Sequence, residues 1–265
     1  MELLAYMLAI LIGISLGLIG SGGSILTVPI LVYMLHIDPL MATAYSLFIV
    51  GVTALFGGAS YAKQGFVDFR MVWVFGIPSI FMVLVTRAFI MPQIPSILLQ
   101  VQGFTLSKAT FVMLLFAVIM LLASLSMIRS KQYECIAEPQ KFNYSGILVK
   151  GLFLGLITGM VGAGGGFLII PTLVIFGHMP MKRAVGTSLF IVAFNSLIGF
   201  LGFLEIDSHL IDWKMLAIFS VVSILGIFIG FQIAKHIEGA KLKKAFGWFV
   251  LLMGFYIIFR EVVYI

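Results

Sequence analysis

Long apolar runs recur along the whole chain, and short polar segments separate them. Within the runs only Lys150 is charged. They are Leu3 to Gly20, Met41 to Tyr61, Met71 to Thr86, Thr110 to Met127, Ile147 to Gly162, Ala184 to Leu204, Met215 to Ile233 and Ala245 to Phe259. A helix that spans a bilayer needs about 20 mainly apolar residues, and lipid cannot satisfy a bare backbone. The pattern predicts an all-α polytopic membrane protein.

The composition supports the same class. Hydrophobic residues make up 62% of the chain and charged residues 10%, and the mean hydropathy is +1.21. A soluble domain carries roughly 25% charged residues to coat its surface, so a soluble fold is excluded. Cys135 is the single cysteine, which rules out a disulfide within the chain.

The second half of the chain repeats the first at an offset of 142 residues, which becomes 144 further on. Apolar bias alone would not align the glycine, proline and histidine positions. The matches are Gly13, Gly17, Gly20, Gly22, Gly23, Pro29 and His36 with Gly155, Gly159, Gly162, Gly164, Gly165, Pro171 and His178. We therefore expect a first repeat over 1–128, a linker over 129–145 and a second repeat over 146–265.

Each repeat is expected to form a glycine-broken helical hairpin followed by three transmembrane helices, about eight membrane segments in all. Lysine and arginine favour cytoplasmic loops, and Arg129, Lys131, Lys141 and Lys150 place the linker inside. The acidic loop before Asp212 suits the outside. The two repeats then lie upside down relative to each other, a common plan in secondary transporters.

Two basic residues do not fit this charge pattern, because Arg87 and Lys108 fall on the outer side. We expect Arg87 to snorkel to the membrane interface. The alternative is that it attracts anions at the outer mouth.

The two glycine clusters are the first candidate for chemistry. Glycines in the middle of an apolar run break a helix, and freed backbone is tolerated there only where it is buried in protein or lines a cavity. A helix that starts after the break directs unpaired N–H groups and a partial positive charge at the gap, which suits an anion. The candidate substrate-binding residues are Gly20, Ser21, Gly22, Gly23, Ser24, Gly162, Gly164, Gly165 and Gly166. The alternative is close helix packing, which we expect for Gly13 and Gly17.

Small polar residues inside the spans are the second candidate. Ser46, Thr187 and Ser188 lie near helix starts, where hydroxyls bind an oxyanion or a partner helix. Asn195 is a polar group well inside a span, and such groups often face a cavity. It would equally serve to tie two helices together.

Other classes of site find no support. The carboxylates lie near the ends of the spans, and His36 and His178 lack companion ligands, so we expect no metal site and no cofactor. The glycines have no strand before them, as a dinucleotide fingerprint requires. No nucleophile and base are paired within the spans, so we expect the chain not to be an enzyme.

The segments "GLIGSGGSILTVPIL", "GLITGMVGAGGGFLIIPTLV" and "AVGTSLFIVAFNSLIG" resemble the TauE/SafE family of sulfite exporter-like permeases. The likeness covers essentially the whole chain. In the first half "MATAYSLF" departs from the usual A-x-G-T-S-L pattern, where Tyr45 stands opposite Thr187. The resemblance implies about eight membrane segments and a substrate among sulfite, organosulfonates and related sulfur anions.

These observations predict a secondary transporter that moves a small anion by alternating access around a central site. The alternatives are a transporter of another small solute and a non-transporting membrane assembly subunit. The expected partners are the anionic substrate, the lipid bilayer and a second copy of the chain, with no nucleic acid. The expected location is the cell membrane, which in a prokaryote is the cytoplasmic membrane.

Overall fold

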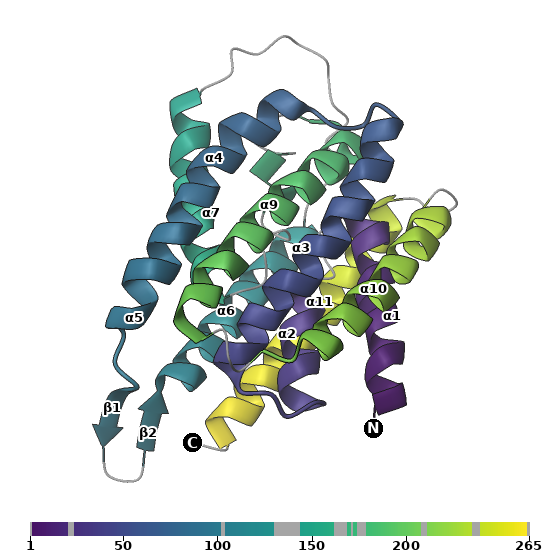
Figure 1. The fold of residues 1–265 in the computed structure, drawn as a ribbon. Coiled ribbons are helices and arrows are strands. Elements are labelled where there is room, and N and C mark those ends of the chain that lie inside the picture. Colours follow the sequence, from purple (N-terminus) through teal and green to yellow (C-terminus); the bar gives the residue numbers. More distant parts are fainter. Residues whose placement is uncertain are drawn as a thin grey trace.

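The protein is a bundle of helices in the computed structural model (Figure 1). Residues 2–20, 24–101, 104–129, 144–161, 169–170, 172–173, 179–207, 211–234 and 239–263 are described. The long helices are α1 (Glu2–Ile19), α3 (Pro39–Lys63), α4 (Phe69–Val85), α6 (Lys108–Arg129), α7 (Tyr144–Val161), α9 (Met181–Asp207), α10 (Trp213–Ala234) and α11 (Gly239–Val263), with the shorter α2 (Ser24–Tyr33). The predicted helical class is confirmed.

The helices pack in pairs that join the two halves of the chain. α1 packs on α10, α4 on α7, α3 on α9 and α6 on α11 (Figure 1). The repeat offset matches α1 with α7 and α10 with α4, so it converts the first pair into the second. The first long helix of each half therefore rests on a helix of the other half.

Glycines allow α1 and α10 to touch backbone to backbone. A Cβ added at Gly13 would lie 2.0 Å from the carbonyl oxygen of Ser223. A Cβ added at Gly155, the matching position in α7, would lie 2.3 Å from the carbonyl oxygen of Ser79. Ser79 and Ser223 are themselves related by the offset of 144. The packing role expected for Gly13 is confirmed, and the same close contact is built twice.

Hydrogen bonds at the helix starts also occur in pairs. The Asp68 side chain accepts from the Met71 N–H at 3.2 Å and starts α4, and Asp212 accepts from the Met215 N–H at 3.0 Å and starts α10. Such caps satisfy N–H groups that a helix leaves unpaired. The turn before α3 repeats before α9, because Ile37 N–H donates to the Leu31 carbonyl and Met179 N–H to the Leu173 carbonyl.

The region after α4 differs from the expectation. α4 continues through a π turn, η1 (Thr86–Ile90), into α5 (Met91–Gln93), so the apolar helical rod covers Phe69–Gln93 rather than ending near Thr86. Two short antiparallel strands follow, β1 (Ile97–Val101) and β2 (Phe104–Ser107), with Val101 opposite Phe104. The sequence reasoning did not predict this hairpin, because it has no long alternating pattern.

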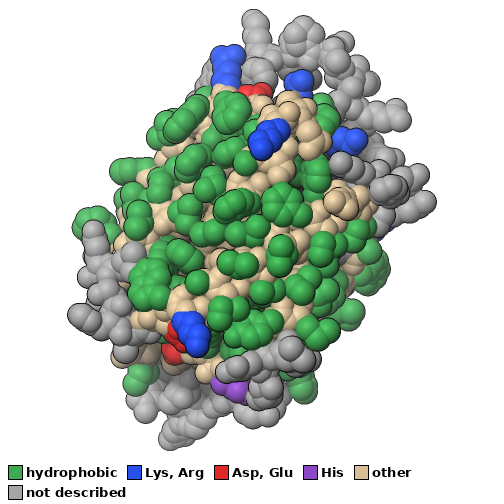
Figure 2. Space-filling view, turned by 45° about the vertical axis from the view of Figure 1, so that its right-hand side comes forward, with side chains coloured by type: hydrophobic (Ala, Val, Ile, Leu, Met, Phe, Trp, Pro, Cys, Tyr) green, Lys and Arg blue, Asp and Glu red, His purple; other side chains and the backbone are tan. Residues whose placement is uncertain are grey.

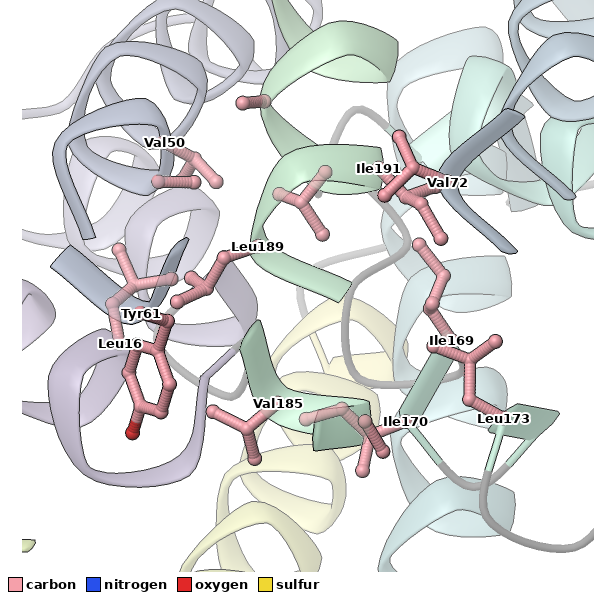
Figure 3. Packing of buried hydrophobic residues seen from close by; sticks show 14 of the residues in the cluster. Leu16, Val50, Tyr61, Val72, Ile169, Ile170, Leu173, Val185, Leu189 and Ile191 are labelled. Atoms are coloured by element: carbon pink, nitrogen blue, oxygen red, sulfur yellow. The ribbon is translucent and has the colours of Figure 1, made fainter. Parts of the chain in front are cut away.

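The bundle is apolar both inside and on its sides. Figure 3 shows buried side chains from the two halves packed together, among them Leu16, Val50 and Ile191. Hydrophobic side chains also cover the middle of the face in Figure 2, while Lys, Arg, Asp and Glu lie toward its two ends. Phe81, for example, is 61% exposed. Five helices among the described residues are long and apolar enough to cross a membrane, as expected for a protein that lies in lipid.

The expected linker falls mostly between α6 and α7, and residues 130–143 lie outside the described residues. The boundaries 1–128, 129–145 and 146–265 and the total of eight membrane segments stay predictions.

We predict that Gly13→Ala and Gly155→Ala each destabilise the folded protein, by about 1–3 kcal/mol, because the new methyl group forces two helices apart. The measurement is the midpoint of thermal unfolding in detergent. The control is Gly76→Ala in α4, where the nearest atom to the new Cβ would be 3.9 Å away. That change adds helix propensity and should leave the midpoint unchanged or raise it. Equal midpoints for all three variants would contradict the close contact.

Candidate functional site

Buried polar side chains follow helix α9 along its interfaces with α3 and α4. α3 and α9 run antiparallel, because Gly51 approaches Leu197 while Gly58 approaches Phe190. α4 runs parallel to α9, because Ser79 contacts Asn195 while Val83 approaches Gly199. Interior polar groups are costly in a bundle that lies in lipid, and they often mark a substrate pathway.

At the start of α9, the Thr187 hydroxyl accepts a hydrogen bond from the Asp68 N–H at 3.0 Å. The Tyr45 hydroxyl accepts from the Asp212 N–H at 2.9 Å in the other half. Tyr45 matches Thr187 and Asp68 matches Asp212 in the repeat. The tyrosine that departs from the expected pattern thus carries its hydroxyl to the same kind of partner. Sequence reasoning did not anticipate this role, although the alignment of Tyr45 with Thr187 was its signal.

Gly20, at the first glycine break, also lies near the start of α9. Gly20 has a φ of +87°, which favours glycine, and a Cβ there would lie 2.6 Å from Cγ1 of Val185. The Ser188 hydroxyl donates to the Val185 carbonyl at 2.8 Å. Gly20 and Ser188 therefore flank one residue of α9. Gly20 and Ser188 come from different repeats, and the Thr187 hydroxyl contacts Asp68 instead.

In the middle of α9, the Asn195 amide donates to the Ser79 hydroxyl of α4 at 2.6 Å. Asn195 is fully buried, and its Oδ1 has no hydrogen-bond partner in the described part of the chain. The neighbouring Ser196 hydroxyl is also buried without a partner there. Asn195 thus links α9 to α4 through its amide N–H, and its Oδ1 is an acceptor without a partner among the described residues. Ser79 was missed by sequence reasoning, because one serine in an apolar helix carries no signal of its partner.

At the far end of α9 lies a group from α3 and η1. The Ser46 hydroxyl is buried and has no partner within the described ranges. Arg87 is only 6% exposed and directs Nη2 toward the Thr43 hydroxyl at 3.4 Å. The expectation that Arg87 snorkels to the interface is wrong. The helical rod continues past Thr86, and Arg87 lies on its protein-facing side.

The candidate residues thus fall into separate groups. Because α3 and α9 are antiparallel, Ser46 lies at the opposite end of this pair from Ser188, on the order of 20 Å away at 1.5 Å per helical residue. Asn195 lies between them. Ser21, Gly22, Gly23, Gly162, Gly164, Gly165 and Gly166 lie outside the described residues, as does the side chain of Ser24, whose backbone starts α2.

The polar atoms without partners along this line lower the stability of the fold. Ser46 Oγ, Arg87 Nε, Asn195 Oδ1 and Ser196 Oγ are four such atoms on the α3, α4 and α9 side of the bundle. A buried polar atom left unsatisfied costs roughly 1–3 kcal/mol. Water or a polar solute that reached the line would recover that cost. Within the described residues no group of three or more His, Cys, Asp and Glu is placed to hold a metal ion.

The sequence of the chain is similar to those of membrane transporters. The family model described as "Sulfite exporter TauE/SafE" matches residues 5–257. A "Probable membrane transporter protein" of Xylella fastidiosa (strain 9a5c) is 32% identical over 95% of this chain and 92% of its own length. The "Probable membrane transporter protein YunE" of Bacillus subtilis (strain 168) is 25% identical over 89% of each chain. No solved structure matches the chain.

We predict that Thr187→Val and Tyr45→Phe each lower the unfolding free energy by about 1–3 kcal/mol, because each leaves a backbone N–H without its acceptor. Thermal unfolding in detergent measures the loss. Thr187→Ser keeps the hydroxyl and should retain most of the stability. If Thr187→Val is as stable as Thr187→Ser, the hydrogen bond from Asp68 contributes nothing.

Proposed function

The chain belongs to the TauE/SafE family and is a membrane transporter, and we propose that it carries a small sulfur oxyanion, such as sulfite or an organosulfonate, across the cell membrane. The family is one of transporters rather than of enzymes. The family description supplies the sulfur chemistry, while the relatives' printed names give no substrate. The cell membrane and the anionic substrate are parts of the proposal.

One observation carries this proposal: a line of buried polar groups runs along α9 through a bundle with apolar sides. Its members include the Thr187 hydroxyl, the Asn195 amide and the Arg87 guanidinium. All of these groups can donate hydrogen bonds, and none is a carboxylate. A path of hydroxyls, amides and a guanidinium suits an anion, which needs donors. It would hold the anion weakly enough for release.

We further propose that the two repeats are inverted in the membrane. Helix α1 packs on α10, and its repeat counterpart α7 packs on α4, the counterpart of α10. This reciprocal packing supports a two-fold relation between the halves. The antiparallel run of α3 and α9, which match each other in the repeat, supports opposite orientations. This arrangement offers two equivalent states that open to opposite sides, as alternating access requires.

The packing suggests which parts would move. Pairs α1–α10 and α4–α7 touch through backbone at glycines, so neither pair can slide without a clash. At the α3–α9 interface the nearest atoms belong to side chains: the Gly51 position faces the side chain of Leu197, with the Leu197 backbone N slightly further away, and the Gly58 position faces the ring of Phe190. Side chains change rotamers more easily than helices change register. We therefore propose rigid pairs that rock about the α3–α9 interface.

The proposed binding groups are the backbone amides around the glycine breaks. The first break, Gly20 to Ser24, ends at α2, whose first N–H groups are unpaired by helix geometry. Its matched segment in the second half is Gly162 to Gly166. Thr187, Ser188 and Asn195 would supply hydroxyl and amide groups along the way. Gly20 against Val185 supports a link between the first break and the polar line of α9.

The experiment that tests the function is sulfite flux in vesicles that contain the purified protein. Wild type should carry sulfite faster than chloride or phosphate, and sulfate, thiosulfate and a small organosulfonate would rank the substrates. No protein-dependent flux of any sulfur anion would refute the proposal.

We predict that Asn195→Leu reduces this flux at least tenfold, because it removes a polar group at the middle of the path. The matched control is Ser124→Ala in α6, a buried serine whose hydroxyl donates to the Leu121 carbonyl of its own helix. The control should keep wild-type flux. Normal flux in a folded Asn195→Leu protein would remove Asn195 from the path.

We predict that Gly165→Leu abolishes flux while the protein still inserts, because a large side chain would block access to the backbone amides of the second break. Insertion is checked by the yield of monodisperse protein from membranes, and flux in vesicles is then compared at equal protein. Full flux from such protein would count against the glycine breaks as the binding groups.

A further inference from the structure

Arg87 is a cation buried inside the bundle. It lies in the π turn η1, is 6% exposed and, within the described residues, makes one hydrogen bond, from Nη2 to the Thr43 hydroxyl. Its Nε–H is buried and finds no acceptor among the described residues. A guanidinium has five N–H donors, so this site has donors to spare.

No carboxylate in the described ranges pairs with Arg87. A buried charge that lacks a partner is strongly destabilising, so the fold bears a cost at this position. A second basic side chain nearby makes the local charge more positive. The Lys108 ammonium donates to the Met91 carbonyl, one turn further along the same rod. An anion that entered here would meet two cations.

Hydroxyl groups complete the surroundings. The Thr43 hydroxyl donates to the Leu40 carbonyl at 2.7 Å and accepts a hydrogen bond from Nη2 of Arg87. It therefore holds the guanidinium in place. Ser46 lies one turn further along α3, fully buried, and its hydroxyl has no partner in the described part of the chain. Arg87 and Ser46 thus each keep a buried polar atom available for a further group.

The internal repeat offers a comparison for the structural role of Arg87. The offset of 144 matches it with Phe231, and the offset of 142 matches Thr43 with Val185. Phe231 stacks edge to face on Tyr61, with ring centroids 5.1 Å apart. An aromatic ring therefore fills the equivalent place in the other half, and packing there does not require a cation. Charge is the property that only Arg87 adds.

We propose that Arg87 and Ser46 form a binding site for a small oxyanion at the end of the α3–α9 pair remote from Thr187. The guanidinium pairs with an oxyanion through short, charge-assisted hydrogen bonds, and the Ser46 hydroxyl donates one more. The burial of Arg87 in protein favours a free anion over a lipid headgroup. The site lies at the end of the α3–α9 pair opposite to Gly20, and it rests on the proposed function only for the choice of sulfur anions.

The experiment is thermal unfolding of the full chain in detergent, titrated with sulfite and with sulfate, with chloride at matched ionic strength. A ligand that binds the folded state raises the midpoint by mass action. Arg87→Gln should need about tenfold more anion for the same rise, since a charge-assisted hydrogen bond is worth roughly that factor. Lys63→Gln, which removes an exposed cation at the other end of α3, is the control and should respond like wild type.

A second variant, Arg87→Phe, copies the residue of the other repeat and guards against a simple loss of fold. It should unfold at the same or a higher temperature than wild type without anion, because an uncompensated charge is removed, and its response to sulfite should be weakened. An unchanged response in both variants would overturn the site. A lower midpoint without anion together with a full response would make Arg87 a packing residue.

Two further outcomes would also overturn the proposal. Equal stabilisation by chloride would refute an oxyanion site. Stabilisation that appears in nanodiscs only when anionic lipid is present, and never with free anion, would assign Arg87 to a headgroup. Wild-type flux in vesicles keeps the two proposals apart: Arg87-dependent binding without flux would refute transport and keep the site, whereas flux without Arg87-dependent binding would do the reverse.

Discussion

The contact of one helix backbone with another at glycine is the constraint on which the rest of this structure depends. Between two helices in lipid there is little hydrophobic driving force, so close van der Waals packing has to supply the attraction. Gly13 against Ser223 and Gly155 against Ser79 provide it on the two sides of the bundle. These contacts leave no room for a methyl group. They join the halves of the chain firmly, and α3 and α9 are left between two rigid pairs.

The interior polar groups between these rigid pairs differ in whether they have hydrogen-bond partners. Two hydroxyls near helix starts accept from a defined backbone N–H: Thr187 from Asp68 and Tyr45 from Asp212. These bonds stabilise the fold. Asn195, Ser46 and Arg87 differ, because each retains an unsatisfied buried atom within the described residues. The presence or absence of a hydrogen-bond partner thus distinguishes the members of the line, rather than their residue type.

Much of the framework could be predicted from the sequence, because the duplication makes each feature visible twice. The close-packing role of Gly13 followed from small-residue spacing. The offset matches Asp68 with Asp212, but their capping roles were not predicted. The partner of each glycine face could not be predicted, since pairing across the repeats involves long separations in sequence. Arg87 was misplaced because an apolar run seemed to end at Thr86, whereas the π turn carries the helix onward. Residues 162–166 lie outside the described ranges, so the glycine breaks remain a hypothesis.

The exchange of helices between the halves has a consequence for how the protein is made. Helix α1 leaves the ribosome well before its partner α10, which begins at Trp213. At 5–20 residues per second, roughly 10–40 seconds of synthesis separate the two. During that interval the glycine face of α1 has only lipid, the insertion machinery or earlier helices to rest on. A chain that stops after its first half would expose the same face permanently, which gives membrane quality control a clear sign of an unfinished product.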